Sequence, residues 1–121
     1  MVWDLFCRVI DNYGDIGFCW RLSRQLTTEY GISVRLWVDD LASLQRVCPS
    51  VDQHVPVQQS FDVQICHWTD SFPDVIPGEV VIEAYGCELP AKYIQAMLPD
   101  HSQVQKRVWV NLEYLSAESW V

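Results

Sequence analysis

The fold is decided by residues 2–26, which read VWDLFCRVIDNYGDIGFCWRLSRQL. Residues 2–10 form a mainly apolar, β-rich run, as in a central strand that is covered on both faces. Residues 11–15 form a polar loop. Beyond it, apolar residues recur at steps of three and four, on one face of a predicted helix; they are Ile16, Cys19, Leu22, Leu26 and Tyr30. We expect this helix to begin near Ile16 and to end at Gly31.

The alternation of strand and helix continues along the chain. Strands are predicted at residues 32–38, 55–57, 63–66, 80–84 and 107–112, and short helices at residues 40–47 and 90–98. Residues 69–78, which contain two prolines, are expected to form an irregular loop. Strands separated by short helices indicate an α/β fold, here a Rossmann-like parallel sheet with helices on both faces.

Aromatic and sulfur-containing residues supply much of the predicted core. The tryptophans that lie in strand or helix patterns are expected to be buried; they are Trp3, Trp20, Trp37 and Trp109. The burial of Trp68 and Trp120 stays open, and His67 is expected to be a packed histidine. The five cysteines form no C-x-x-C pair and show no ligand spacing with histidines. We therefore expect buried free thiols in a reducing cytoplasm, and no metal site.

Size and charge limit the classes of function that the chain can have. The 121 residues suit one domain, residues 1–121, and the formal net charge is −8. Such acidity argues against binding nucleic acid or anionic lipid. Residues 47–91 hold seven acids and no Lys or Arg, which suits either a cationic partner or a solvated surface.

The chain's location is predicted from its apolar runs and its ends. No apolar run is long enough to span a membrane, and the N-terminus does not resemble a signal peptide, so a cytoplasmic protein is expected. The chain ends on Trp120 and Val121 without a polar tail. We expect it to be cut from a longer protein.

The loop after the first strand is the candidate site, because ligands of parallel α/β sheets sit at the carboxyl ends of strands. Asp11 and Asp15 enclose Asn12, Tyr13 and Gly14, and Gly17 follows. The glycines would allow a tight turn and close approach of a ligand. The loop matches no phosphate-binding motif and has no Lys, so a phosphate cradle is not expected.

Several roles remain open for these acids. Asp15 could cap the helix and Asp11 could close an Asx turn. A receiver-type phospho-acceptor domain fits poorly, because Cys66-His67-Trp68 and Val110-Asn111-Leu112 occupy the places of its aspartate and lysine. A magnesium hydrolase lacks further ligands. The remaining interpretation is that one of these acids is a general base for an incoming nucleophile.

Two segments carry a resemblance to a known family. Residues 6–26, FCRVIDNYGDIGFCWRLSRQL, closely resemble the N-terminal signature of the EarP family of elongation factor P arginine rhamnosyltransferases. Residues 109–120, WVNLEYLSAESW, resemble a second segment near the end of the family's N-terminal domain. The resemblance covers essentially the whole chain.

The resemblance implies an inverting glycosyltransferase of the GT-B type, built from two Rossmann-like domains. Such enzymes transfer L-rhamnose from dTDP-β-L-rhamnose to an arginine of bacterial elongation factor P, without a metal or other cofactor. This chain would be the N-terminal, acceptor-binding domain. The nucleotide sugar would bind mainly to a C-terminal domain outside this chain, so the fragment alone is not expected to catalyse transfer.

The resemblance also implies residue roles. Asp15 corresponds to the general base and Asp11 to an acid that supports the acceptor site. Other candidates for acceptor binding are Asn12, Tyr13, Gly14, Gly17, Glu113 and Tyr114, of which Tyr13 could stack on the acceptor arginine. The alternative function is a non-catalytic Rossmann-like binding module that presents an acidic face to a basic protein.

Overall fold

The fold is a mixed α/β sheet, seen in a computed structural model that describes residues 1–9, 13–84, 87–97 and 108–112. The elements in chain order are β1 (Val2–Cys7), α1 (Tyr13–Tyr30), β2 (Ser33–Val38), α2 (Leu41–Val47), β3 (Val57–Ser60), β4 (Val63–His67), β5 (Val80–Ala84), α3 (Ala91–Met97) and β6 (Val108–Leu112). The strand order is β3-β4-β2-β1-β5-β6. All neighbouring pairs are parallel except β3 with β4.

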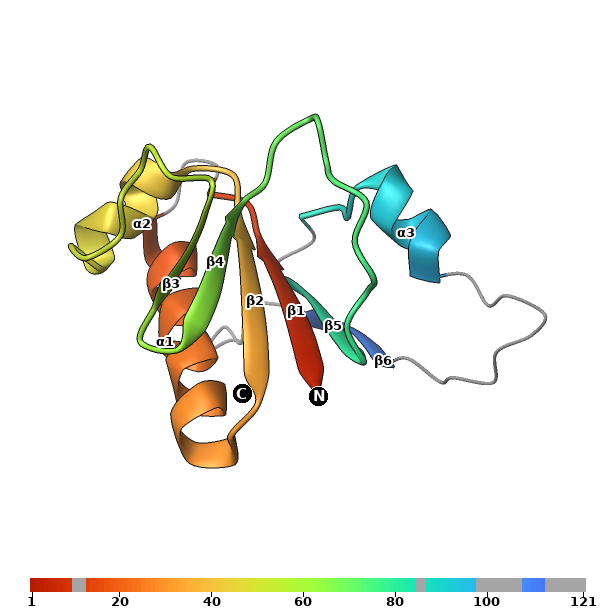
Figure 1. Ribbon diagram of the computed structural model, residues 1–121, viewed down its shortest axis with the longest axis horizontal. Helices are drawn as coiled ribbons and strands as arrows, with labels where there is room; N and C mark the ends of the chain where they lie inside the picture. Colours follow the sequence, from red (N-terminus) through yellow and green to blue (C-terminus); the bar gives the residue numbers. More distant parts are fainter. Residues whose placement is uncertain (10–12, 85–86, 98–107, 113–121) are drawn as a thin grey trace, which may run out of the picture.

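Helices cover both faces of this sheet, as the alternation of strands and helices predicted (Figure 1). Side chains of successive strand residues point to opposite faces. Leu5, Leu36 and Ile65 therefore pack with α1 and α2, whereas Phe6 and Trp37 pack on the other side with Tyr93 of α3. The prediction of an α/β fold with helices on both faces of a largely parallel sheet is thus confirmed, with one antiparallel edge strand added.

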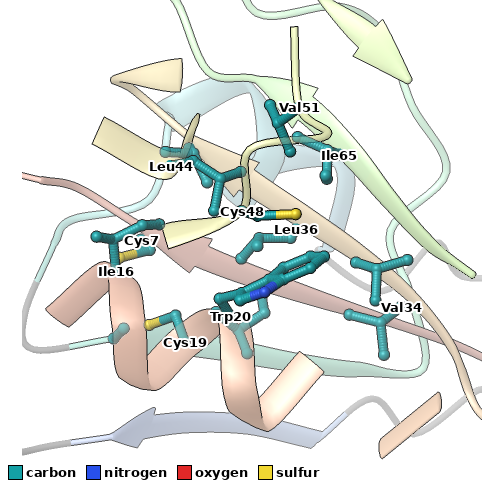
Figure 2. Packing of buried hydrophobic residues seen from close by; sticks show 14 of the residues in the cluster. Cys7, Ile16, Cys19, Trp20, Val34, Leu36, Leu44, Cys48, Val51 and Ile65 are labelled. Atoms are coloured by element: carbon teal, nitrogen blue, oxygen red, sulfur yellow. The ribbon is translucent and has the colours of Figure 1, made fainter. Parts of the chain in front are cut away.

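The α1 side of the core is mostly aliphatic. Trp20 reaches from α1 onto the sheet and lies among Val34, Leu36 and Cys48 (Figure 2). The opposite side is aromatic: Phe6 stacks on Trp37 with ring centroids 5.7 Å apart and meets Tyr93 edge-on at 4.7 Å. Such aromatic pairs stabilise a core beyond the area that they bury. β1 is therefore held from both faces, which fixes the strand that leads into the candidate loop.

The structure confirms the predicted end of α1 and the helix predicted at residues 40–47. Gly31 ends α1 with φ +63°, a left-handed conformation that suits glycine. Asp40 is the N-cap of α2, and its side chain accepts hydrogen bonds from the backbone N and the Oγ of Ser43. The start of α1 was wrong, because the helix begins at Tyr13 and not near Ile16.

Two further predictions were wrong. The strand predicted at residues 55–57 lies instead at Val57–Ser60, where polar residues form an exposed edge strand that apolar periodicity does not reveal. Trp109 is 50% exposed and not in the core, because β6 lies at the edge of the sheet. Of the other tryptophans, Trp20, Trp37 and Trp68 are buried and Trp3 packs partly buried against the core. Trp120 lies outside the described residues.

Candidate functional site

The candidate site lies at the carboxyl ends of the four inner strands. Cys7 at the end of β1 pairs with Val38 at the end of β2, and Val38 pairs with His67 at the end of β4. Phe6 pairs with Glu83 of β5, one residue before that strand ends. The strands therefore end level with one another. The connections that follow them share one edge of the sheet, where parallel α/β sheets bind ligands.

The structure locates the predicted loop residues only in part. Asp15 lies in the first turn of α1, so it does not cap the helix from outside it. Gly14 and Gly17 also lie within α1, so the prediction of a glycine turn is wrong there. The side chains of Tyr13 and Asp15 fall outside the described residues.

Other predicted site residues lie beyond the described part of the chain. Asp11 and Asn12 belong to the connection between β1 and α1, and Glu113 and Tyr114 follow β6. β6 ends at Leu112, which pairs with Ala84. The last described residue before Glu113 is therefore level with the end of β5.

One residue at this edge was missed by the sequence analysis. Asp39 directly follows β2, and its Oδ1 accepts a hydrogen bond from the backbone N of Val9 at 2.6 Å. The Asp39–Asp40 pair between a strand and a helix was the available signal, but only Asp40 has the role of a cap. Asp39 thus connects the end of β2 to the chain that leads into the candidate loop.

His67 is a packed histidine, as predicted. It is partly buried, and its Nε2 lies 3.0 Å from the carbonyl oxygen of Asp39. Because a carbonyl oxygen only accepts, Nε2 carries the proton in this contact. The ring therefore braces the end of β4 against the residue after β2.

At the same edge, the guanidinium of Arg8 packs on the ring of Trp68. The Cζ atom of Arg8 lies 4.5 Å from the centroid of the Trp68 ring, within the range of a cation–π contact. Trp68 is itself fixed, because its backbone N donates to the carbonyl oxygen of Val38 at 2.8 Å. Arg8 is the cation nearest in sequence to the acidic loop.

The connection after β5 carries backbone strain at the same edge. Glu88 has φ +59°, a backbone conformation that is uncommon for residues other than glycine. Residues held in such conformations cluster at functional sites. Its neighbour Cys87 donates from Sγ to the carbonyl oxygen of Phe6 at 3.5 Å. The segment is therefore tied to β1.

Two of the buried thiols, Cys66 and Cys87, are poor nucleophiles. Burial raises the pKa of Cys66 to about 11 and that of Cys87 to about 12, so both are protonated near neutral pH. None of the five cysteines forms a disulfide, and all five are buried. In the part of the chain that the structure describes, no three His, Cys, Asp or Glu side chains gather in a group that could hold a metal ion.

A hollow of about 400 Å³ lies on the aromatic side of the sheet. Its walls include Arg35, Trp37 and Cys66. The guanidinium of Arg35 is bound to Asp4, with Nε 2.6 Å from Oδ1. The residues that line this hollow include no carboxylate, so it does not suit a cationic ligand. None of the helices in the described ranges combines the length and apolar character that crossing a membrane requires.

Together these features define an α/β domain with a mostly parallel sheet, whose first strand leads in the sequence to Asp11 and Asp15. Residues 3–121 match the family described as Elongation-Factor P (EF-P) rhamnosyltransferase EarP. The chain therefore belongs to the EarP family.

Curated relatives named protein-arginine rhamnosyltransferase match most of this chain. The chain is 50% identical over 119 residues to the protein-arginine rhamnosyltransferase of Pseudomonas putida. It is 48% identical to that of Pseudomonas aeruginosa and 47% identical to that of Shewanella oneidensis. In each comparison 98% of this chain is covered, but only 31% of the relative. The chain thus spans about a third of the length of these relatives.

Proposed function

We propose that this chain is the acceptor-binding half of an inverting protein-arginine rhamnosyltransferase of the GT-B type. The observation that carries the proposal is the family match over residues 3–121, which includes the acidic loop after β1. The proposed acceptor is an arginine of elongation factor P, and the proposed donor is dTDP-β-L-rhamnose. The donor would bind mainly to parts of the enzyme beyond this chain, which spans 31% of its relatives' length.

The chemistry of the acceptor explains why acids suit this loop. A guanidinium has a pKa above 12 and a delocalised charge, so it is a poor nucleophile. A carboxylate cannot remove its proton in the ground state. It can orient the group by charge-assisted hydrogen bonds and take the proton as the new N–C bond forms.

Within this proposal Asp15 is the general base and Asp11 supports the acceptor guanidinium. The first turn of a helix is a favourable place for a carboxylate, because the helix dipole stabilises negative charge there. The acceptor would be contacted by Asn12, Tyr13, Gly14, Gly17, Glu113 and Tyr114. Inversion then needs only one displacement at the anomeric carbon and no covalent enzyme intermediate.

The proposal is tested with the full-length enzyme, elongation factor P and dTDP-rhamnose. Mass spectrometry should find one deoxyhexose added to an arginine of the factor. Asp15→Ala should lower kcat by about 10²–10⁴-fold, the usual contribution of a general base. Glu29→Gln, an exposed change near the other end of α1, serves as the control and should leave kcat unchanged.

Two results would contradict this assignment. Transfer at a near wild-type rate by Asp15→Ala would remove the general-base role. Binding of elongation factor P by the wild-type protein without any transfer would favour the alternative, a non-catalytic module that recognises a basic protein surface.

A further inference from the structure

The chain beyond the end of β1 needs a hydrogen-bond acceptor. β1 ends at Cys7, so the backbone N–H of Val9 lies outside the sheet ladder. A partly buried backbone donor without a partner costs free energy. The carboxylate of Asp39 accepts from this N–H at 2.6 Å, across a separation of 30 residues.

The carboxylate of Asp39 is not needed for the helix that follows it. Asp40 caps α2, because its Oδ1 accepts from the backbone N of Ser43 at 3.3 Å and its Oδ2 from Oγ at 2.8 Å. The side chain of Asp39 instead accepts from the backbone N of Val9. Two adjacent aspartates therefore serve different elements.

Asp39 is itself braced from the side of β4. His67 Nε2 lies 3.0 Å from the Asp39 carbonyl oxygen, and the backbone N of Trp68 donates to Val38 at 2.8 Å. The acceptor for Val9 is thus held by the ends of β2 and β4. A group that is fixed on a rigid scaffold can in turn fix the loop that it contacts.

From these contacts we propose that Asp39 is a positioning residue for the connection between β1 and α1. It holds Val9, which stands two residues before Asp11 in the sequence, at the start of this connection. This inference rests on the proposed function. A displacement of about 1 Å at a catalytic group can cost about a hundredfold in rate, so the bond to Val9 bears on kcat.

The test uses the full-length enzyme and two readouts. Hydrogen exchange measures protection of the Val9 amide, and steady-state kinetics separate kcat from KM. Asp39→Ala should speed exchange at Val9 about tenfold or more, as expected for the loss of a hydrogen bond to a charged group. It should lower kcat by about tenfold to a hundredfold, with little change in KM for the nucleotide sugar.

Two variants give matched comparisons. Asp39→Asn keeps an acceptor oxygen and should retain most of the Val9 protection and most of kcat. Asp40→Ala removes the neighbouring carboxylate and the cap of α2, and should leave exchange at Val9 unchanged. If Asp39→Ala does not fold, His67→Phe replaces it, since this change frees the Asp39 carbonyl and should speed Val9 exchange to a smaller degree.

The outcomes separate this inference from the proposed function. Unchanged Val9 exchange in Asp39→Ala, or in His67→Phe where that variant is used, would overturn the positioning role. Faster exchange without any fall in kcat would also overturn it. If the wild-type enzyme transfers no rhamnose, the proposed function fails, while the exchange measurement still decides whether Asp39 holds the loop.

Discussion

Asp4 is a fully buried carboxylate in the middle of β1, and four residues donate to it. Arg35 contacts both of its oxygens, Trp37 Nε1 and the Gly78 backbone N lie 3.0 and 2.8 Å away, and the Tyr93 hydroxyl also donates. Burial and the adjacent negative charge raise the pKa of Tyr93, so its hydroxyl remains a donor. The set joins β1 and β2 to α3 and to the chain before β5.

Removal of this carboxylate should destabilise the protein strongly. Asp4→Ala leaves the Arg35 guanidinium without its counter-charge, and we expect a loss of about 3–5 kcal/mol in the free energy of unfolding. Urea denaturation measures the loss. Asp74→Ala breaks an exposed ion pair to Lys92 and should change stability little. Equal effects of the two substitutions would contradict the structural role of Asp4.

Residue patterns show why Asp4 was not predicted. The strand at residues 2–10 was visible from its apolar run, and Asp4 interrupted that run without an evident reason. Its partners lie 31, 33, 74 and 89 residues further along the chain. Only the packing of β2 and α3 on one face brings them together. Gly78, whose backbone N donates to Asp4, must be glycine, because a Cβ there would lie 2.6 Å from the Val2 carbonyl oxygen.

At the scale of elements, the β3–β4 hairpin depends on an unusual turn. Phe61 and Asp62 have φ +51° and +65°, and a two-residue hairpin turn of this kind normally favours Asn and Gly. Phe61 packs edge-on against Trp20 at 6.1 Å, and Arg24 lies 4.3 Å from its ring. These contacts with α1 explain an aromatic residue in the turn.

The turn makes a prediction about the hairpin. Asp62→Val places a β-branched residue in the left-handed region and should lower the free energy of unfolding by about 1–2 kcal/mol. Asp62→Asn, which tolerates this conformation, should have little effect. Thermal denaturation of both variants provides the measurement, and equal melting temperatures would show that the turn does not require this backbone conformation.

Helix boundaries divide into those that local chemistry predicted and those that it did not. Asp40 and Gly31 are specific signals for the start of α2 and the end of α1, and both were correct. The start of α1 was placed too late, because the apolar period begins at Ile16 while the helix begins at Tyr13. Gly14 and Gly17 suggested a turn, but both occupy helical positions.

Across the whole molecule, the core has buried groups that resist ionisation. Cys66 and Cys87 have pKa values of about 11 and about 12 because burial disfavours the thiolate. In the unfolded chain a thiol ionises near pH 8.5. Between about pH 9 and 11 the unfolded state therefore binds fewer protons than the folded state, and stability falls as the pH rises.

This linkage gives a measurable pH dependence. The free energy of unfolding should decrease by up to about 1.4 kcal/mol per pH unit for each buried thiol above pH 9. Denaturation curves from pH 7 to 11 test this slope, and Cys66→Ala should make it shallower. A constant stability over this range would contradict burial of the ionisable groups.

The candidate site was predictable to a different extent from the fold. The site at Asp11 and Asp15 was predicted from their position after a strand and from the family signature, and it stays a prediction. The contribution of Asp39 could not be read in the same way, since its contact with Val9 depends on the register of β1 against β2. Arg8 over Trp68 likewise joins residues from separate strand ends.

The exposed ring of Trp109 gives the protein an optical property. Among the described tryptophans, Trp20, Trp37 and Trp68 are buried, whereas Trp109 is half exposed and its Nε1 donates to Glu83 at 3.3 Å. Aqueous quenchers of fluorescence reach an exposed indole far more easily than a buried one. Any protein segment that binds over β6 should therefore protect this indole from quenching by iodide and shift its fluorescence emission to shorter wavelength.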